Sequence, residues 1–251
     1  MAVNENDFSV MTLNIRFGLA QDGDNSWQNR EPLFAQVLKR YPASFFGVQE
    51  ANHFQTRFLA KNLCDNDFIG WHNRSKEWWQ SNLIFYHKSW ECLEHKHFFL
   101  SETPDVESKL PGSKWPRQFV VGLFQKGSNR VVMANTHFDF QESVQEKSAT
   151  LAIRFLSRFP KDCPVIITGD FNSNPGGRAY AVFKGNGFVE AFDNNNSTTF
   201  HNFTGQATLD HIDWILYRGN LKLIGKKIIM DSFSGRYPSD HYPVTAAFSI
   251  I

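Results

Sequence analysis

The sequence predicts an α/β fold in which two mixed β-sheets pack face to face and helices cover their outer faces. Strand-like apolar runs recur along the whole chain, and several are continuously apolar, which is typical of strands covered on both faces. Helical patterns are fewer, so the chain has too few crossover connections for one parallel sheet. In such a sandwich, the loops at one end gather into a cleft.

The apolar runs that predict strands are distributed from one end of the chain to the other. They cover residues 8–17, 44–50, 81–88, 119–125, 130–138, 164–171, 211–218 and 244–250.

Helical spacing occurs in a few of the segments between these runs. In the first of them, the apolar residues share one face, Pro32 lies in the first turn and Pro42 lies beyond the end. A later and longer pattern stops at Pro160. The expected helices cover residues 30–41, 52–63 and 143–159, followed by a shorter helix that opens at Gly176 and Gly177.

The composition fits a single domain over residues 1–251. No Ser/Gly-rich stretch, charge block or repeat marks a linker, and 25 Phe and 7 Trp residues can fill one large core. The formal net charge is +1, so the chain lacks the basic excess that attracts a polyanion strongly. A nucleic-acid substrate is not excluded, but the charge does not favour one.

The cysteines and the N-terminus indicate an ordinary reduced, cytoplasmic protein. Cys64, Cys92 and Cys163 lack C-x-x-C spacing, so they predict neither a disulfide framework nor a thiolate zinc site. No basic start with an apolar core marks a signal peptide. No apolar run is long enough to span a bilayer. We expect a monomer.

Polar and acidic residues stand at or near the ends of many of the apolar runs. Asn14 lies in NIR, Glu50 in GVQE, Asp170 in GDFN and Asp240 in SDH. Carboxylates that converge repel one another, and burial raises that cost. A hard divalent cation would keep them charged, and carboxylate and amide oxygens are the ligands that Mg²⁺ prefers. The sequence therefore predicts a Mg²⁺ site, at which Mn²⁺ is the alternative.

Two motifs place an acid beside an amide. In NTHFD, a strand projects Asn135, His137 and Asp139 from one face, and GDFN does the same with Asp170 and Asn172. This combination can hold a water or an oxyanion. For any one motif taken alone, the alternative is a turn, because Asp and Asn are common at strand ends.

The motifs GVQE, NTH, GDFN and SDH follow one another as in the endonuclease/exonuclease/phosphatase superfamily, which the chain resembles from Asn14 to His241. The wider sequence is most similar to a bacterial branch. The resemblance implies a four-layer α/β/β/α sandwich and divalent-metal-dependent hydrolysis of a phosphoester.

The resemblance also implies a metal site and a site for the attacking water. Glu50 is expected to be the principal metal carboxylate, with Asn14 and Asp240 completing the metal surroundings. Asp170 is expected to orient or deprotonate the water, helped by Asn172.

Two imidazoles are expected at the phosphate. His241 would contact the scissile phosphate or protonate the leaving oxygen, and Asp213 would hold its imidazole. For Asp213, the alternative is a backbone amide or Arg218 as partner. His137 would be the second imidazole, and Asn135 is expected to bind substrate. An in-line displacement needs an activated water, a Lewis acid and positive charge, which these groups would supply.

Two positions depart from the family pattern. Many relatives place an acidic residue before the run at 81–88, where this chain has Gln80, with Glu77 a turn earlier. For the remaining phosphate contact we choose Arg117, because a guanidinium can hold phosphate bidentately. A surface ion pair is the alternative for Arg117.

The sequence thus predicts a Mg²⁺-dependent hydrolase that acts on a phosphorylated small molecule or a flexible phosphodiester. A DNA or RNA nuclease with the same residues is the first alternative. A catalytically inactive binding module is disfavoured, because the metal acid, the GDFN pair and the final histidine are all present. Substrate choice is expected in the loops at 71–80, 101–115 and 194–206, where Trp71, Trp78, Trp79 and Trp115 either stack on a base or sugar or only pack.

Overall fold

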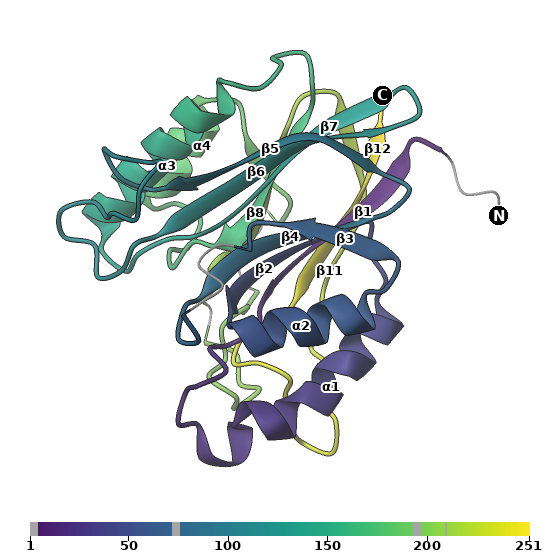
Figure 1. Ribbon diagram of the computed structural model, residues 1–251, viewed down its shortest axis with the longest axis vertical. Coiled ribbons are helices and arrows are strands. Elements are labelled where there is room, and N and C mark those ends of the chain that lie inside the picture. Colours follow the sequence, from purple (N-terminus) through teal and green to yellow (C-terminus); the bar gives the residue numbers. More distant parts are fainter. Residues whose placement is uncertain (1–4, 72–75, 193–196, 209) are drawn as a thin grey trace.

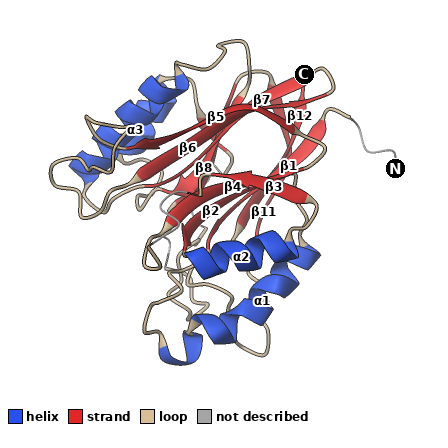
Figure 2. Cartoon of the chain, in the orientation of Figure 1, coloured by secondary structure: helices blue, strands red, loops and turns tan. Residues whose placement is uncertain are grey.

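The computed structural model describes residues 5–71, 76–192, 197–208 and 210–251. Within these residues, two six-stranded mixed sheets stack on each other, and helices cover the outer face of each (Figures 1 and 2). The predicted four-layer α/β/β/α sandwich is confirmed. No helix in the described ranges is long and apolar enough to cross a membrane.

The two sheets repeat one pattern of strand directions. In each, the third and fourth strands in spatial order are parallel, and the other neighbours are antiparallel. The first sheet contains, in spatial order, β11 (Leu221–Ile228), β12 (Val244–Ile250), β1 (Asp7–Asn14), β2 (Phe45–Ala51), β4 (Ser81–His87) and β3 (Asn66–Ile69). The second contains β5 (Glu91–Phe99), β6 (Gln118–Lys126), β7 (Asn129–His137), β8 (Val165–Asp170), β10 (Asp213–Arg218) and β9 (Val189–Glu190).

Helices connect the parallel strands, as a βαβ unit requires. The crossovers are α1 (Trp27–Arg40) between β1 and β2 and α3 (Glu142–Leu156) between β7 and β8. The remaining helices are α2 (His53–Asn62), α4 (Arg178–Gly185) and the 3₁₀ turn η1 (Gly23–Asn25).

The start of α1 corrects one expectation. The carbonyl of Ser26 accepts hydrogen bonds from the N–H groups of Asn29 and Arg30, so the helix begins at Trp27 rather than at Arg30. Pro32 therefore lies inside the helix and not in its first turn. Its missing N–H leaves one helical carbonyl without its usual donor.

The structure contains strands that the apolar runs did not predict. These strands, β3, β5, β9 and β11, are the edges of the two sheets. β5 and β11 are exposed along most of their length, and β11 carries Lys222, Lys226 and Lys227. Charged side chains on an edge oppose pairing with other chains. They also remove the apolar pattern that marks a buried strand.

Three buried clusters fill the spaces between the four layers. Phe45 and Val120 belong to the cluster between the sheets. Phe46 packs with Phe34 of α1 on the outer face of the first sheet, and Phe155 of α3 packs on the outer face of the second. The adjacent residues Phe45 and Phe46 thus enter different clusters, because successive side chains of a strand point to opposite faces.

At one end of the sandwich the sheets approach closely around Gly47 of β2. A Cβ atom at Gly47 would lie 2.0 Å from Oγ1 of Thr168 and 2.8 Å from Oδ1 of Asn135, so no larger residue fits without displacement. Here Gln49 donates from Nε2 to Oδ1 of Asn135 at 2.7 Å, and Thr168 donates to the same oxygen at 3.2 Å. We call Gln49, Asn135 and Thr168 the polar bridge; it joins the two sheets.

We expect Gly47→Ala to lower the free energy of unfolding by about 1–3 kcal/mol, because the added methyl group overpacks the polar bridge. Urea denaturation monitored by circular dichroism measures this change. Gly185→Ala is the matched control, since nothing lies within 4 Å of a Cβ at that position. Equal stability of the two variants would contradict the close approach at Gly47.

Candidate active site

The carboxyl ends of both parallel strand pairs meet at the end of the sandwich marked by the polar bridge. Asn14 ends β1, and Glu50 lies one residue before the end of β2. His137 and Asp170 end β7 and β8 and are paired in register, while Asp213 begins β10 opposite Asp170. Residues far apart in the sequence therefore gather at one place.

A β-bulge directs Glu50 into this site. The pairing of β2 with β4 shifts register between Val48 and Ala51, and Glu50 has φ of 65°, in the left-handed region that few non-glycine residues adopt. Bulges of this kind re-aim a side chain. The backbone N–H of Phe17 then donates to Oε2 of Glu50 at 2.8 Å.

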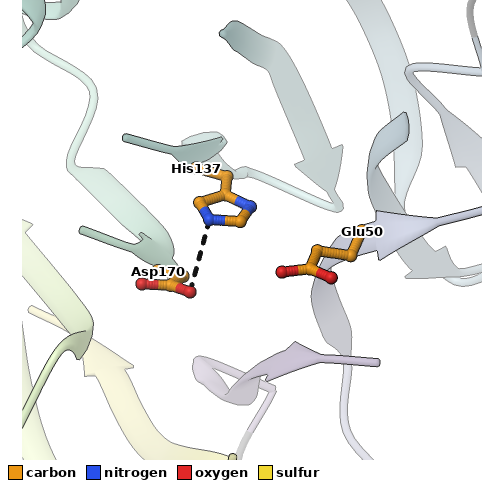
Figure 3. A group of neighbouring side chains, drawn as sticks. All are labelled: Glu50, His137 and Asp170. Atoms are coloured by element: carbon orange, nitrogen blue, oxygen red, sulfur yellow. Dashed lines mark ion pairs between the residues drawn. The ribbon is translucent and has the colours of Figure 1, made fainter. Parts of the chain in front are cut away.

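Glu50, His137 and Asp170 form a group of potential metal ligands. One ligand atom from each lies within 4.8 Å of those of the other two, and Figure 3 shows the Glu50 carboxylate facing the space beside the other side chains. Asn14 donates from Nδ2 to both carboxylates, at 3.0 Å to Glu50 and 2.9 Å to Asp170. Asp170 and Asp213 form a second group with His241.

Burial gives Asp170 unusual acid–base properties. Desolvation, with the nearby charge of Asp213, raises the pKa of Asp170 to about 7, although the positive charge of His241 opposes the rise. The N–H of Asn172 donates to Oδ1 of Asp170 at 2.9 Å. The other oxygen, Oδ2, lies 3.4 Å from Nε2 of His137 and 3.7 Å from Nε2 of His241.

Asp213 holds the imidazole of His241. Its Oδ2 lies 2.9 Å from Nδ1 of His241, and both side chains are buried. The alternative partner, Arg218, instead donates to the carbonyl of Asn186. Desolvation alone would lower the pKa of His241, but the charges of Asp213 and Asp170 outweigh it and raise that pKa well above its usual value.

His137 is in the opposite state. Burial, with the positive charges of Arg117 and His241, lowers the pKa of His137 well below its usual value. The 3.4 Å contact of His137 with Asp170 is therefore a contact of a neutral imidazole rather than an ion pair of full charges. Nδ2 of Asn172 lies 3.1 Å from Nε2 of the same ring.

Asp240 forms an ion pair with Arg16. Its Oδ2 lies 3.3 Å from Nη1 of Arg16, and Ser239 donates to its Oδ1 at 3.1 Å. Arg16 also bonds both oxygens of Asp22, at 2.8 and 2.9 Å. The sequence prediction did not include Arg16 or Asp22; the only signal was the arginine two positions after Asn14 in the NIR motif.

Arg30, which the motif DNSWQNR suggested for the rim of the pocket, is instead a buried residue that joins two segments of the site. It is 2% exposed and donates to the carbonyls of Ile15 at 2.9 Å and Pro238 at 2.8 Å. It therefore ties the segment after Asn14 to the segment before Asp240. Burial lowers the pKa of Arg30 to about 10. The sequence signal for this burial was the position of Arg30 on the apolar face of the predicted helix, where a charged residue is unusual.

Arg117 is a buried rather than a surface residue. Its Nε lies 3.5 Å from Oδ2 of Asp139 and has no hydrogen-bond partner among the residues that the structure describes. Desolvation lowers the pKa of Arg117. The Asp139 carboxylate is fixed by the backbone N–H groups of Lys114 and Phe140, both at 2.9 Å. Asp139 thus provides a fixed negative charge next to the guanidinium of Arg117.

Asn135 does not reach the site surface. It is fully buried, and its Nδ2 donates to the carbonyls of Val48 at 2.8 Å and Leu83 at 2.9 Å. Its Oδ1 belongs to the polar bridge. Every hydrogen-bonding position of this amide is used inside the protein, so none remains for a substrate.

Two adjoining cavities open at the site. The smaller, of about 190 Å³, is lined by polar groups that include Arg16, Glu50 and Arg117. The larger, of about 370 Å³, has Trp78 and Trp79 in its wall. Both are lined by Phe17, Gln80, Trp115, Arg117 and His137.

The loops expected to choose the substrate contribute unequally to these cavities. Trp71 packs against Phe68 and His53 instead of lining either cavity, and Glu77 is exposed. Residues 72–75 and 194–196 of the expected loops lie outside the described part of the chain.

The sequence model described as the Endonuclease/Exonuclease/phosphatase family matches residues 11–241. No curated protein matches the sequence significantly. Solved structures do match. A protein of the same family from Bacteroides thetaiotaomicron is 26% identical, with a TM-score of 0.90 and coverage of 98% of each chain.

Two further structures illustrate the range of similar proteins. A mannosyl-6-phosphatase from Bacteroides thetaiotaomicron is 27% identical, with a TM-score of 0.88 over 96% of this chain and 99% of that one. TDP2 of D. rerio, complexed with single strand DNA product, has a TM-score of 0.77 over 97% and 99% of the two chains, at 17% identity. At 17% identity, the similarity to TDP2 concerns the fold alone.

We expect NMR titration of the metal-free protein to give His241 a pKa above the value of about 6.5 that is usual for imidazole. Asp213→Asn should lower that pKa, because the carboxylate that raises it is gone. Because the pKa of His241 is higher in the folded than in the unfolded protein, the pair with Asp213 stabilises the fold fully below about pH 6.5. This stabilisation is lost as the pH rises through the folded-state pKa of His241. Asp213→Asn should therefore destabilise more in mild acid than in alkali.

Asp105→Asn, at an exposed carboxylate, is the control for this titration. An unchanged His241 pKa in Asp213→Asn would show that the pair does not set the charge of the imidazole.

Proposed function

Because the chain belongs to the endonuclease/exonuclease/phosphatase family, we propose that it is a divalent-metal-dependent hydrolase of phosphoesters with a small phosphorylated substrate. The observation that carries this proposal is the group of Glu50, His137 and Asp170 within 4.8 Å, beside a cavity that Arg117 also lines. Ligands for a metal and a cation for phosphate thus stand side by side.

The donor atoms of this group fit Mg²⁺ or Mn²⁺. The carboxylate oxygens of Glu50 and Asp170 are the ligands that these ions prefer, and the group contains no thiolate. The imidazole of His137, which burial keeps neutral, is left to contact the phosphoryl group. The raised pKa of Asp170 marks a deficit of positive charge that a bound cation relieves. We assign Glu50 as the principal ligand, with Asn14 orienting it and Asp240 completing the surroundings.

The bound ion would act as a Lewis acid for the negative charge on the phosphoryl oxygens. Burial raises the pKa of Asp170 to about 7 in the metal-free protein. A bound cation would lower that pKa, so that the carboxylate is ionised near neutral pH and can accept the proton of the attacking water. The backbone N–H of Asn172 fixes Oδ1 of that carboxylate, and Asn14 donates to Oδ2, whose remaining acceptor position would receive the water. Arg117 and His137 would hold the phosphoryl group.

His241 would complete the reaction on the leaving-group side. As the water oxygen bonds to phosphorus, the bond from phosphorus to the ester oxygen breaks. The imidazolium of His241 can give its Nε2 proton to that oxygen, while Asp213 stabilises the imidazolium through Nδ1. Asp170 thus takes up one proton from the water, and His241 releases one proton to the leaving oxygen, so the site gains no net proton.

A small substrate is favoured over a long nucleic acid. The net charge of +1 provides no strong attraction for a polyanion, and the two cavities are of the size of a small ligand. The 27% identical structure is named a mannosyl-6-phosphatase, which supports a phosphomonoester. A nuclease with the same residues remains the alternative to be compared in assays.

We expect hydrolysis of a generic phosphoester such as p-nitrophenyl phosphate to require added Mg²⁺ or Mn²⁺ and to stop in excess EDTA. Glu50→Gln should lower the rate by at least about a hundredfold, because it removes a charged metal ligand. Full activity in EDTA would contradict a metal-dependent site. Glu142→Gln, at an exposed carboxylate, should behave as the original protein.

Asp170→Asn and His241→Ala should each lower kcat by about a hundredfold or more, the effect expected for acid–base and charge-stabilising groups. Cys64→Ser, at an exposed thiol, should leave kcat unchanged. The measurement is steady-state kinetics at saturating metal, with circular dichroism to show that each variant folds. A fully active Asp170→Asn variant would remove Asp170 from the proposed chemistry.

A further inference from the structure

We propose that the larger cavity binds the leaving group of the substrate and that this leaving group is a sugar ring. This inference rests on the proposed function, because it takes the phosphoryl group to lie in the smaller cavity beside Arg117 and Glu50.

The two cavities are continuous. Phe17, Gln80 and Trp115 line both, together with the proposed phosphate contacts Arg117 and His137. A group bonded to the phosphorus atom can therefore extend from the smaller cavity directly into the larger one. The volume of about 370 Å³ is near the lower end of the range of roughly 300–1,000 Å³ for small-ligand pockets, which suits one ring rather than a long chain.

The wall of the larger cavity presents indole rings to solvent. Trp78 is 56% exposed and Trp115 is 52% exposed, whereas Trp79 is buried with its ring centroid 5.9 Å from that of Trp78. The ammonium groups of Lys76 and Lys114 lie 5.2 Å and 5.5 Å from the ring centroids of Trp78 and Trp115. Exposed aromatic rings at the wall of a pocket mark a binding surface. The C–H face of a sugar ring packs on such an indole while its hydroxyl groups remain free for hydrogen bonds.

Besides Arg117 and His137, which face the proposed phosphate site, the polar side chains of this cavity are the amides of Gln80, Asn82 and Gln118. Asn82 donates from Nδ2 to the carbonyl of Gln118 at 3.1 Å, which leaves its Oδ1 as an acceptor. The side chain of Gln118 already makes two hydrogen bonds: its Nε2 donates to the carbonyl of Gln80, and its Oε1 lies 3.0 Å from Nε2 of His97. Among the described residues, no hydrogen bond engages the side-chain amide of Gln80. A free amide both donates and accepts, as a hydroxyl group does.

The position of Gln80 and Trp115 favours a sugar over an acyclic chain or a nucleoside. Both residues line the junction of the cavities, so they meet the first group attached to the phosphoryl oxygen. In a hexose 6-phosphate a single methylene group separates the phosphoryl oxygen from a hydroxylated six-membered ring. An acyclic alcohol has no ring face for an indole, and a nucleotide carries a base beyond its ribose that a cavity of about 370 Å³ would have to hold as well.

The test compares initial rates with saturating Mg²⁺ on glucose 6-phosphate, mannose 6-phosphate, glycerol 3-phosphate and adenosine 5′-monophosphate. We expect kcat/KM for at least one hexose phosphate to exceed the other two by roughly tenfold or more. Trp78→Ala should lower kcat/KM for that hexose phosphate by roughly tenfold and leave glycerol 3-phosphate nearly unchanged, since Trp78 lines only the larger cavity. Leu93→Ala, at an exposed residue outside both cavities, is the control.

A binding measurement separates this inference from the proposed function. In EDTA, calorimetry with inorganic phosphate and with the preferred hexose 6-phosphate should show tighter binding of the sugar phosphate, and Trp78→Ala should remove only that difference. Equal affinities, a preference for adenosine 5′-monophosphate, or an equal loss on every substrate in Trp78→Ala would overturn the sugar subsite. The proposed function fails separately, if none of these monoesters nor p-nitrophenyl phosphate is hydrolysed.

Discussion

The close approach of the two sheets at Gly47 determines where the site can form. Gly47 leaves room for the polar bridge, in which the amides of Gln49 and Asn135 and the hydroxyl of Thr168 meet between the sheets. Buried polar groups need partners, so the hydrogen bonds to Oδ1 of Asn135 form only when the sheets keep their mutual register. The carboxyl ends of β2 and β8 are thereby held together, and the site residues stand on them.

The second constraint is charge. Asp170, Asp213 and Asp240 are buried within one end of the molecule, and half-buried Glu50 faces them. His241 compensates Asp213, and Arg16 compensates Asp240. Oδ2 of Asp170 lies 3.7 Å from Nε2 of His241, but burial outweighs that positive charge and raises the pKa of Asp170 to about 7. A divalent cation is the group that would complete the charge balance and keep Asp170 ionised as a base near neutral pH.

The sequence predicted the parts of the fold that burial controls. Every strand recognised as an apolar run lies in the interior of a sheet, whereas the edge strands β3, β5, β9 and β11 lack that pattern because one side of each meets water. The motifs also predicted that the site residues lie at or near the ends of strands, which are β1, β2, β7 and β8 in the structure. The bulge that turns Glu50, the inward position of Asn135 and the contact of Arg16 with Asp240 depend on three-dimensional register, which local sequence does not encode.

The most direct test of the central claim is a crystal structure with Mn²⁺ and inorganic phosphate, in which the anomalous signal of manganese locates the ion without assumptions. The account predicts a manganese peak coordinated by Glu50, in the space that it shares with His137 and Asp170, and phosphate between this ion and Arg117. A fully occupied manganese ion elsewhere, with Glu50 free of metal, would contradict it.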